Sequence, residues 1–184
     1  MNGFRISAAA AVLGLAGCGG GAGDAPAPGV AAVPGATQVA TVSAVNEAEL
    51  TRYVNLGGGT VAGSASFGGA SCAGRVVRLY PGITAVREAY EAYNRGERVA
   101  NNPNSEIRVT SARRQAVCDA SGSFRFANLP DGPWVVATEV RSSGAAPQSQ
   151  LVHRLVDVKR GETAQVTFGE RDIIRVRDAR MTGS

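Results

Sequence analysis

The sequence is poor in the residue types on which many enzyme sites depend. Its 184 residues include one histidine, His153, three cysteines and a single lysine. A single histidine excludes every site that needs two or more imidazole ligands, which removes many zinc and iron enzymes. The length allows one domain of ordinary size and leaves no room for a second, catalytic domain.

Large apolar residues are also few. Leu, Ile and Phe together number 18 residues, whereas Val alone numbers 22 and Gly, Ala and Pro together number 63. A helical bundle needs Leu at its core positions, so a valine-rich composition favours a small β domain instead. The excess of Gly, Ala and Pro indicates an additional flexible segment.

The start of the chain has the pattern of an export signal. Arg5 precedes an uncharged apolar run over residues 6–16. This run has the length of a signal-peptide core and is too short to cross a bilayer, which needs roughly 20 residues. It ends in Leu15-Ala16-Gly17-Cys18, which resembles the lipobox of bacterial lipoproteins. An ordinary secretory signal with an incidental cysteine is the alternative.

The lipobox resemblance implies a signal peptide over residues 1–17 and a lipid on Cys18, through which the membrane is a partner. Two or more acyl chains give lasting attachment. Gly19 follows the cysteine in place of the Asp that retains some lipoproteins in the inner membrane, so the outer membrane is expected. Residues 18–42 contain the lipidated cysteine and a Gly/Ala/Pro-rich linker, which we expect to be flexible. Because such a chain is exported, we expect no nucleic-acid partner.

Residues 43–168 predict an all-β domain. Short β-type runs divided by turn-forming residues indicate a seven-stranded antiparallel β-sandwich with strands at 60–66, 75–80, 105–117, 123–128, 134–140, 150–158 and 163–168. Ile107 and Val109 are expected on one face of the third strand. Asn46 and Glu49 predict a capped helix over residues 47–54, although an extended conformation is nearly as well supported. Residues 169–184 are expected to form a charged C-terminal tail.

The connection over residues 81–104 is longer than an ordinary hairpin loop. Val86, Ala89, Tyr90 and Tyr93 follow the spacing of one helix face, which predicts a short helical insertion of about three turns. Such an excursion can carry function or can be a simple flap on the sandwich edge.

The cysteines allow one disulfide. If Cys18 carries lipid, Cys72 and Cys118 remain, and an even remainder in an exported domain favours pairing. Closing a loop of about 47 residues would stabilise the fold by roughly 4 kcal/mol in the chain-entropy model. Two thiolates and one distant histidine make an incomplete zinc site, so we expect no metal and no cofactor.

The segment from Asp119 to Trp134 contains a spaced set of turn and apolar residues: Asp119, Gly122, Phe124, Phe126, Leu129, Pro130, Gly132 and Trp134. It resembles the signature of carboxypeptidase regulatory-like domains, which have a transthyretin-like (prealbumin-like) sandwich. Residues 59–63 and 76–81 fit the same family, so the resemblance extends over about 57–168. It implies a hairpin turn at Asp119 and Gly122, inward-pointing Phe124 and Phe126, and Trp134 covering the core edge.

The resemblance implies no enzyme activity. These domains accompany metallocarboxypeptidases but lack the catalytic zinc site, and this sequence has no His-x-x-Glu pair. Hydroxyisourate hydrolases and intradiol dioxygenases have similar folds, but each needs more than the one histidine that is present. An unrecognised hydrolase is left as a minor alternative.

Two functions remain open at this point. The first is a protein-interaction or structural module of the cell envelope, with an unidentified envelope protein as partner, using a strand edge or the 81–104 insertion. The alternative is a carbohydrate- or peptidoglycan-binding lipoprotein that contacts glycan through Tyr90, Tyr93 and Trp134. The same aromatic residues could instead be packed in the core. The basic pair Arg113-Arg114 fits an anionic glycan or lipid headgroup, or a solvated strand face.

Overall fold

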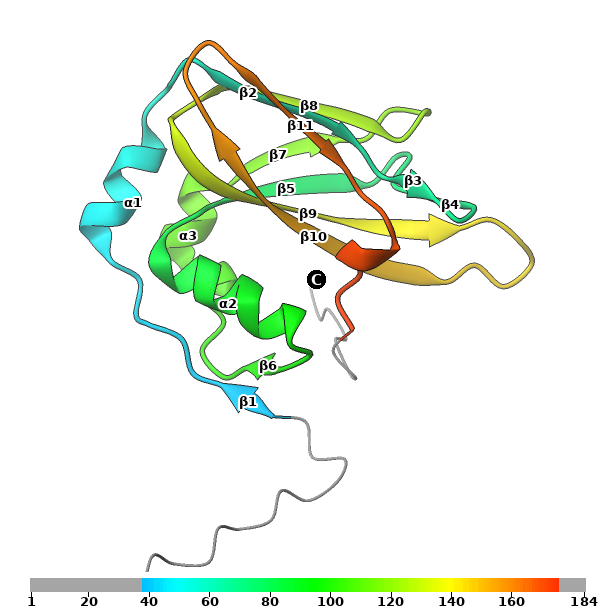
Figure 1. Cartoon of the computed structure of the whole chain (residues 1–184), viewed down its shortest axis with the longest axis horizontal. Helices are drawn as coiled ribbons and strands as arrows, with labels where there is room; N and C mark the ends of the chain where they lie inside the picture. The colour runs from blue at the N-terminus through cyan, green and yellow to red at the C-terminus, as the bar shows by residue number, and fades with distance from the viewer. Residues whose placement is uncertain (1–37, 176–184) are drawn as a thin grey trace, which may run out of the picture. The chain divides into compact units, whose positions relative to one another are not determined.

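The computed structural model describes residues 38–175. The predicted signal peptide 1–17, the predicted lipidation site Cys18, the predicted linker up to residue 37 and the residues beyond 175 lie outside the described residues. The described part is mostly β-sheet with a few short helices (Figure 1). Its elements in chain order are β1 (Val39–Ala40), α1 (Glu47–Val54), β2 (Gly59–Ser64), β3 (Ser66–Phe67), β4 (Ala70–Ser71), β5 (Val76–Pro81), α2 (Thr84–Asn94), β6 (Arg98–Val99), η1 (Pro103–Ser105), α3 (Ile107–Ala112), β7 (Arg114–Val117), β8 (Ser123–Leu129), β9 (Gly132–Ser142), β10 (Ser149–Val158), β11 (Thr163–Thr167) and η2 (Glu170–Asp172).

Two sheets face each other across the core. The larger sheet has six strands in the order β3-β4-β9-β5-β7, with β10 on the other side of β9, and the smaller has the order β11-β2-β8. Each of the seven predicted runs overlaps one of the longer strands, and four two-residue strands, β1, β3, β4 and β6, bring the described strands to eleven. The prediction of an entirely antiparallel sandwich is wrong, because β11 pairs with β2 in parallel and β1 pairs with β6 in parallel.

The space between the sheets is filled by alternating side chains of the long strands. Val77 and Leu79 of β5 and Trp134 and Val136 of β9 point into it and are fully buried. Phe124 and Phe126 of β8 approach from the other sheet, as predicted, with ring centroids 6.1 Å apart. Period-two alternation of apolar residues therefore sets which face of each strand meets the core.

The predicted strand at residues 105–117 is wrong over its first half. This part forms η1 and α3, and only its end, β7, pairs with β5. Ile107 is 81% exposed while Val109 and Ala112 are fully buried, which is the spacing of a helix face and not of a strand. Three residues in the order apolar, polar, apolar are too few to separate a helix from a strand. In the folded protein this segment is a helix that packs against β5 and α1.

The last residues assigned to the linker belong to the fold. Residues 38–46, which we call the N-terminal strap, lie along the helical insertion (Figure 1). β1 pairs with β6, the Asn101 side chain both donates to and accepts from the backbone of Val42, and Ser43 donates twice to Glu88. Placing the end of the linker at residue 42 was therefore wrong, because hydrogen-bond partners for this segment come from residues far along the chain.

Helix α1 has the predicted bounds and the predicted N-cap. The Asn46 side chain accepts hydrogen bonds from the backbone of Ala48 at 2.9 Å and of Glu49 at 3.4 Å. The Glu49 carboxylate does not complete a capping box. It accepts instead from the backbone N–H and the hydroxyl of Thr84, both at 2.7 Å, and so caps the start of α2. These hydrogen bonds hold the pKa of Glu49 below its usual value.

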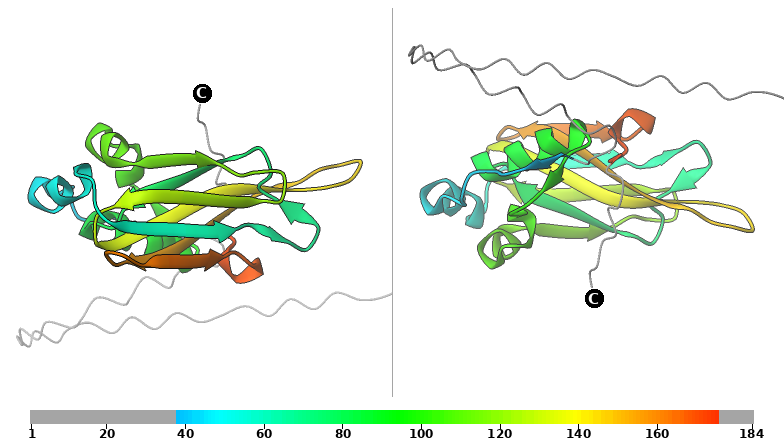
Figure 2. Two further views of the ribbon diagram at one scale, coloured as in Figure 1. Left: turned by 90° about the horizontal axis from the view of Figure 1, so that it is seen from above. Right: turned by 90° about the horizontal axis from the view of Figure 1, so that it is seen from below.

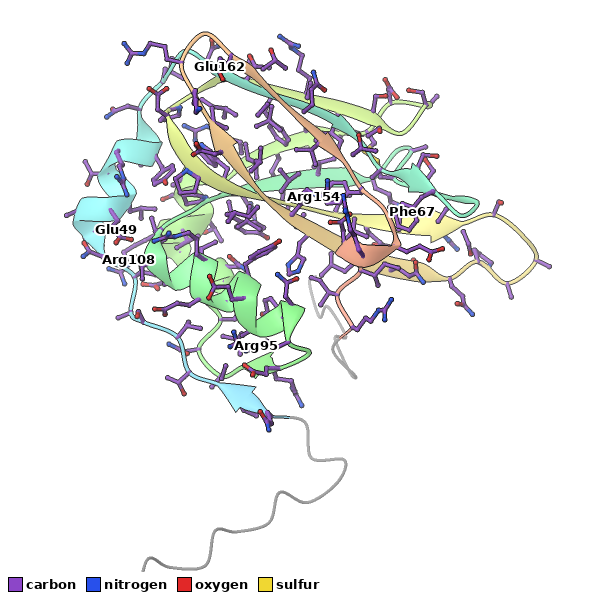
Figure 3. The ribbon with its side chains drawn as sticks, in the orientation of Figure 1. Glu49, Phe67, Arg95, Arg108, Arg154 and Glu162 are labelled. Carbon is purple, nitrogen blue, oxygen red and sulfur yellow. A yellow bond between two sulfur atoms is a disulfide. The ribbon has the colours of Figure 1, made fainter. Side chains whose placement is uncertain are left out.

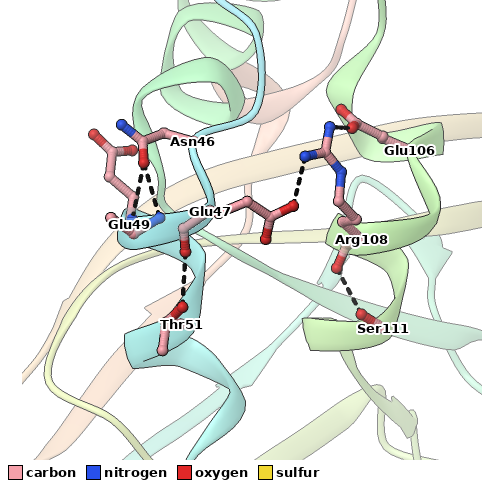
Figure 4. A network of polar contacts seen from close by, with 8 residues as sticks. Asn46, Glu47, Glu49, Thr51, Glu106, Arg108 and Ser111 are labelled. Carbon is pink, nitrogen blue, oxygen red and sulfur yellow. Dashed lines mark hydrogen bonds and ion pairs between the residues drawn. The ribbon is translucent and has the colours of Figure 1, made fainter.

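An ion-pair network joins α1 to α3 (Figure 4). Arg108 of α3 contacts Glu47 of α1 at 2.5 Å and also pairs with Glu106. Exposed pairs of this kind contribute little to stability, typically below about 1 kcal/mol. Their effect is to fix the two helices side by side at one end of the sandwich.

The C-terminal residues of the described part are also packed, contrary to the expectation of a tail from residue 169. Ile173 bridges to Val152 of β10, and the Ile174 N–H donates to the Leu151 carbonyl at 2.9 Å. Arg154 donates two hydrogen bonds, at 2.9 and 2.7 Å, to the buried Asp172 carboxylate (Figure 3). This bidentate pair attaches the segment after β11 to the edge of the larger sheet.

The predicted turn at Asp119 forms, but the strands that it connects belong to different sheets. One Asp119 carboxylate oxygen accepts from the backbone of Ser121 and Ser123, both at 2.9 Å, and Gly122 has a φ of 79°, which favours glycine. The turn joins β7 of the larger sheet to β8 of the smaller one, so it is a crossing between sheets and not a hairpin.

The structure places Cys72 and Cys118 at disulfide-bonding distance, with their Cα atoms 5.8 Å apart, in the predicted pairing. Both residues are buried at the end of the β5–β7 pair. Among the described residues, none of the helices has the length and apolar character that crossing a membrane requires.

Candidate binding surface

The six-stranded sheet has an outer face, turned away from the three-stranded sheet. Residues paired directly across strands share a face, so the register places Arg78 and Tyr80 of β5 beside Ala137 and Val135 of β9, and His153 of β10 beside Ala137. None of these side chains is on the Trp134 face. Helix α2 covers part of the outer face, as the view from below in Figure 2 shows.

Helix α2 is fixed at its start by two contacts with other elements. Glu49 of α1 caps Thr84, and the Gly82 N–H donates to the Pro133 carbonyl at 2.9 Å. A side chain at Gly82 would collide with the Pro133 backbone, so the glycine allows the chain to pass close to β9 before the helix begins. The helix is therefore held against the sheet at a defined point.

The C-terminal half of α2 packs on His153. The rings of Tyr90 and Tyr93 lie 4.5 and 6.2 Å from the imidazole centroid, and Asn94 Oδ1 lies 2.8 Å from His153 Nε2. His153 is only 4% exposed, and its burial lowers its pKa to about 4, against a weaker opposing effect of Asp172. The imidazole is therefore neutral near pH 7 and already engaged by Asn94, which suits it to positioning side chains and not to acting as a general base.

Tyr90 and Tyr93 are the two predicted surface residues that the structure brings together. Both are half-buried, with one side of each ring near His153. Burial raises the pKa of the Tyr93 hydroxyl, so it stays protonated and can donate a hydrogen bond. Two partly exposed rings one helical turn apart form a firm aromatic surface at the border of the open part of the sheet.

The third predicted surface residue, Trp134, is not at the surface. Its exposed fraction is 0%, its Nε1 donates to the Pro130 carbonyl at 3.1 Å, and its ring meets that of Tyr53 edge to face at 5.0 Å. Assigning Trp134 to a binding surface, or to the edge of the core, was wrong. The strand period places it on the inner face, where its large apolar area is removed from water.

Beyond α2 the outer face is open and carries charged and polar side chains. The Arg113 guanidinium lies over the Tyr80 ring, 5.8 Å from its centroid, a distance at which cation–π attraction acts. Arg78 stands one row further along, paired with Gln115 of β7, and Glu139 lies on the same face. Arg78, Arg113 and Glu139 are half-buried, and Gln115 is exposed.

The sequence indicated some of these residues but not their grouping. The sequence indicated Tyr90, Tyr93 and Arg113 as aromatic or basic candidates, whereas it gave no signal for Asn94 or Arg78. The period of β5 alone would place Arg78 and Tyr80 on one face. Their proximity to α2 and β10 depends on strand order, which no local pattern reveals.

Comparisons with known proteins give a structural likeness but no family. No protein-family model matches the sequence, and no curated protein matches it. A crystal structure from Pseudomonas aeruginosa, described as a "putative carbohydrate binding protein", superposes with a TM-score of 0.51 at 18% sequence identity. The superposition covers 69% of this chain and 99% of that one. At this identity the likeness supports a shared β-rich fold and no more.

Proposed function

We propose that this chain is a non-enzymatic lipoprotein of the cell envelope that binds carbohydrate on the outer face of its six-stranded sheet. The observation that carries the proposal is the pair of half-buried tyrosines, Tyr90 and Tyr93, held by His153 and Asn94 beside polar side chains of the open sheet. The carbohydrate-binding description of the Pseudomonas protein agrees with it.

The chemistry of the surface suits a sugar. Pyranose rings present flat C–H faces that pack on aromatic rings, and their hydroxyl groups need fixed hydrogen-bond partners at the ring edge. Packing on His153 restricts the rotation of Tyr90 and Tyr93, so little side-chain entropy is lost when a ligand binds. Arg78, Gln115 and Glu139 on the neighbouring strands offer donors and acceptors alongside the rings.

The anchoring part of the proposal depends on sequence. The apolar run over residues 6–16 and Leu15-Ala16-Gly17-Cys18 support export and lipid attachment at Cys18, and Gly19 supports the outer membrane. The segment from Asp119 to Trp134 supports a carboxypeptidase regulatory-like, transthyretin-like sandwich. In that arrangement a tethered domain would retain glycan or peptidoglycan near the membrane surface.

A protein-binding role is the second candidate, and one observation favours it. Val76 and Val117 pair across β5 and β7 on the outer face and are 36% and 63% exposed. Adjacent exposed valines on a sheet face can contribute to a protein interface. A protein partner would use this apolar pair, whereas a glycan would depend on the α2 tyrosines.

A glycan array and a peptidoglycan pull-down with the mature chain test the proposal. Tyr90→Leu and Tyr93→Leu keep the apolar contact with His153 but remove the flat ring, and each should reduce glycan binding by about tenfold. Arg125→Gln changes an exposed side chain on β8 of the opposite, three-stranded sheet, and serves as the control. Absence of binding to every glycan, or binding that is unchanged by both tyrosine variants, would contradict the proposal.

A further inference from the structure

The outer face carries more positive than negative charge beside its aromatic residues. Arg78 lies on β5, and Arg113, at the end of α3 just before β7, lies over Tyr80, two residues along β5 from Arg78. Arg141 extends the same face along β9, and the acidic residues of the face are Glu139 on β9 and, at the opposite end, Asp157 on β10. A ligand on this surface therefore meets a net positive field.

The arginines of this face are not neutralised by the protein. Within residues 38–175, the ion pairs that form involve Arg95, Arg108 and Arg154, and none of them includes Arg78, Arg113 or Arg141. Arg78 and Arg113 are half-buried, whereas Arg141 is exposed. A partly buried guanidinium gains more than an exposed one from a carboxylate that accepts its hydrogen bonds.

We infer that the saccharide bound at this surface is acidic, a uronate-type chain that carries carboxylate groups. This inference rests on the proposed carbohydrate binding and narrows its ligand class. The ring of one sugar would pack on Tyr93 or Tyr90, and the carboxylate of a neighbouring sugar would accept hydrogen bonds from Arg78 and Arg113.

The stacking of Arg113 on Tyr80 supports this assignment. The contact keeps the guanidinium beside Tyr80, at the border between α3 and the open sheet. The planar fork of guanidinium donors matches the two oxygens of a carboxylate, whereas a neutral sugar hydroxyl offers a single, uncharged oxygen. Glu139 on the same face repels a densely charged polyanion, so spaced carboxylates fit better than continuous ones.

Polygalacturonate and its fully methyl-esterified form are matched probes, because they share one sugar backbone and differ in charge. We expect the mature chain to bind polygalacturonate at least tenfold more tightly than the ester, with the difference decreasing as salt is raised from 50 to about 500 mM. Arg78→Gln and Arg113→Gln should each reduce polygalacturonate binding by about tenfold and leave binding of the ester unchanged.

Arg125→Gln is the matched control. Arg125 is exposed on β8, outside the opposite sheet, so the substitution removes the same charge from the far side of the domain. If Arg125→Gln weakens polygalacturonate binding as much as Arg78→Gln does, the attraction is non-specific and the inference is wrong. If the ester binds as tightly as the acid, the inference is wrong while carbohydrate binding stands. Failure of every glycan to bind would overturn the proposed function itself.

Discussion

The two faces of the six-stranded sheet differ in what covers them. The inner face is closed by the three-stranded sheet, and Val77, Leu79, Trp134 and Val136 are fully buried there. The outer face is only partly covered by α2, and its remaining area carries Arg78, Glu139 and half-buried tyrosines. The side chains of the inner face therefore stabilise the fold, while the outer face keeps polar groups accessible.

This difference has a physical origin in the strands themselves. Each long strand alternates between the two faces, so one sequence of β5 supplies Leu79 to the core and Arg78 and Tyr80 to the outer face. Substitutions on alternate residues of one strand should consequently separate stability from binding.

The largest effect is expected on the inner face. Trp134→Ala removes a fully buried ring with its hydrogen bond to Pro130, and should lower the free energy of unfolding by about 3–5 kcal/mol. Urea denaturation followed by circular dichroism measures the change. A loss below about 1 kcal/mol would show that the inner face is not the main source of stability.

The disulfide connects the strands that carry both faces. Replacing Cys72 and Cys118 together by alanine should cost about 2–4 kcal/mol of unfolding free energy, because the unfolded chain gains freedom. Thermal unfolding of the native and double-variant proteins gives this value. Glycan binding by the folded double variant should be unchanged, and a large loss of affinity would mean that the bond also shapes the outer face.

The stability contributed by the part of the outer face beneath α2 should depend on pH, because His153 lies there. The pKa of His153 in the folded protein is about 4, below its usual value of about 6.5, so the unfolded chain binds a proton first as pH falls. The stability that the neutral imidazole contributes is present above about pH 6.5 and is lost progressively as pH falls to 4, by about 3 kcal/mol in total.

Comparing native protein with His153→Gln between pH 7 and 4 isolates this contribution. Glutamine keeps a polar partner for Asn94 but does not titrate, so the difference in unfolding free energy between the two proteins should narrow or reverse with acid. A constant difference across this range would contradict the assignment.

The smallest effect is expected on the open part of the outer face. Val117→Thr changes an exposed side chain on β7 and should alter the free energy of unfolding by no more than about 0.5 kcal/mol. A destabilisation above about 1.5 kcal/mol in the same denaturation assay would indicate that this part of the face is covered in solution.

Much of the fold followed from local patterns. Turn residues such as Gly122 and Gly132, both at positive φ, marked the strand ends, and Asn46 marked the start of α1. The segment at Ile107 was wrongly predicted as a strand, because a short apolar-polar-apolar pattern does not separate a helix from a strand. The parallel pairing of β11 with β2 depends on chain connections that local periodicity does not encode.

The candidate site was less accessible from sequence. Helical spacing identified the face of α2 that carries Tyr90 and Tyr93. Trp134 was offered as a surface residue on its aromatic type alone, without regard to which face of its strand it occupies. Contacts such as Asn94 with His153 join residues 59 positions apart, and only the three-dimensional arrangement brings them together.

The N-terminal strap determines how mechanical load enters the domain. A pull on the chain before residue 38 first reaches the hydrogen bonds of Gln38 with Arg98 and of Ala40 with Ala100, then the paired bonds of Val42 with Asn101. These contacts follow one another along the strap, so they would break before tension reaches α1 or the sheets. The sandwich and its outer face would therefore keep their shape while the strap extends and absorbs displacement.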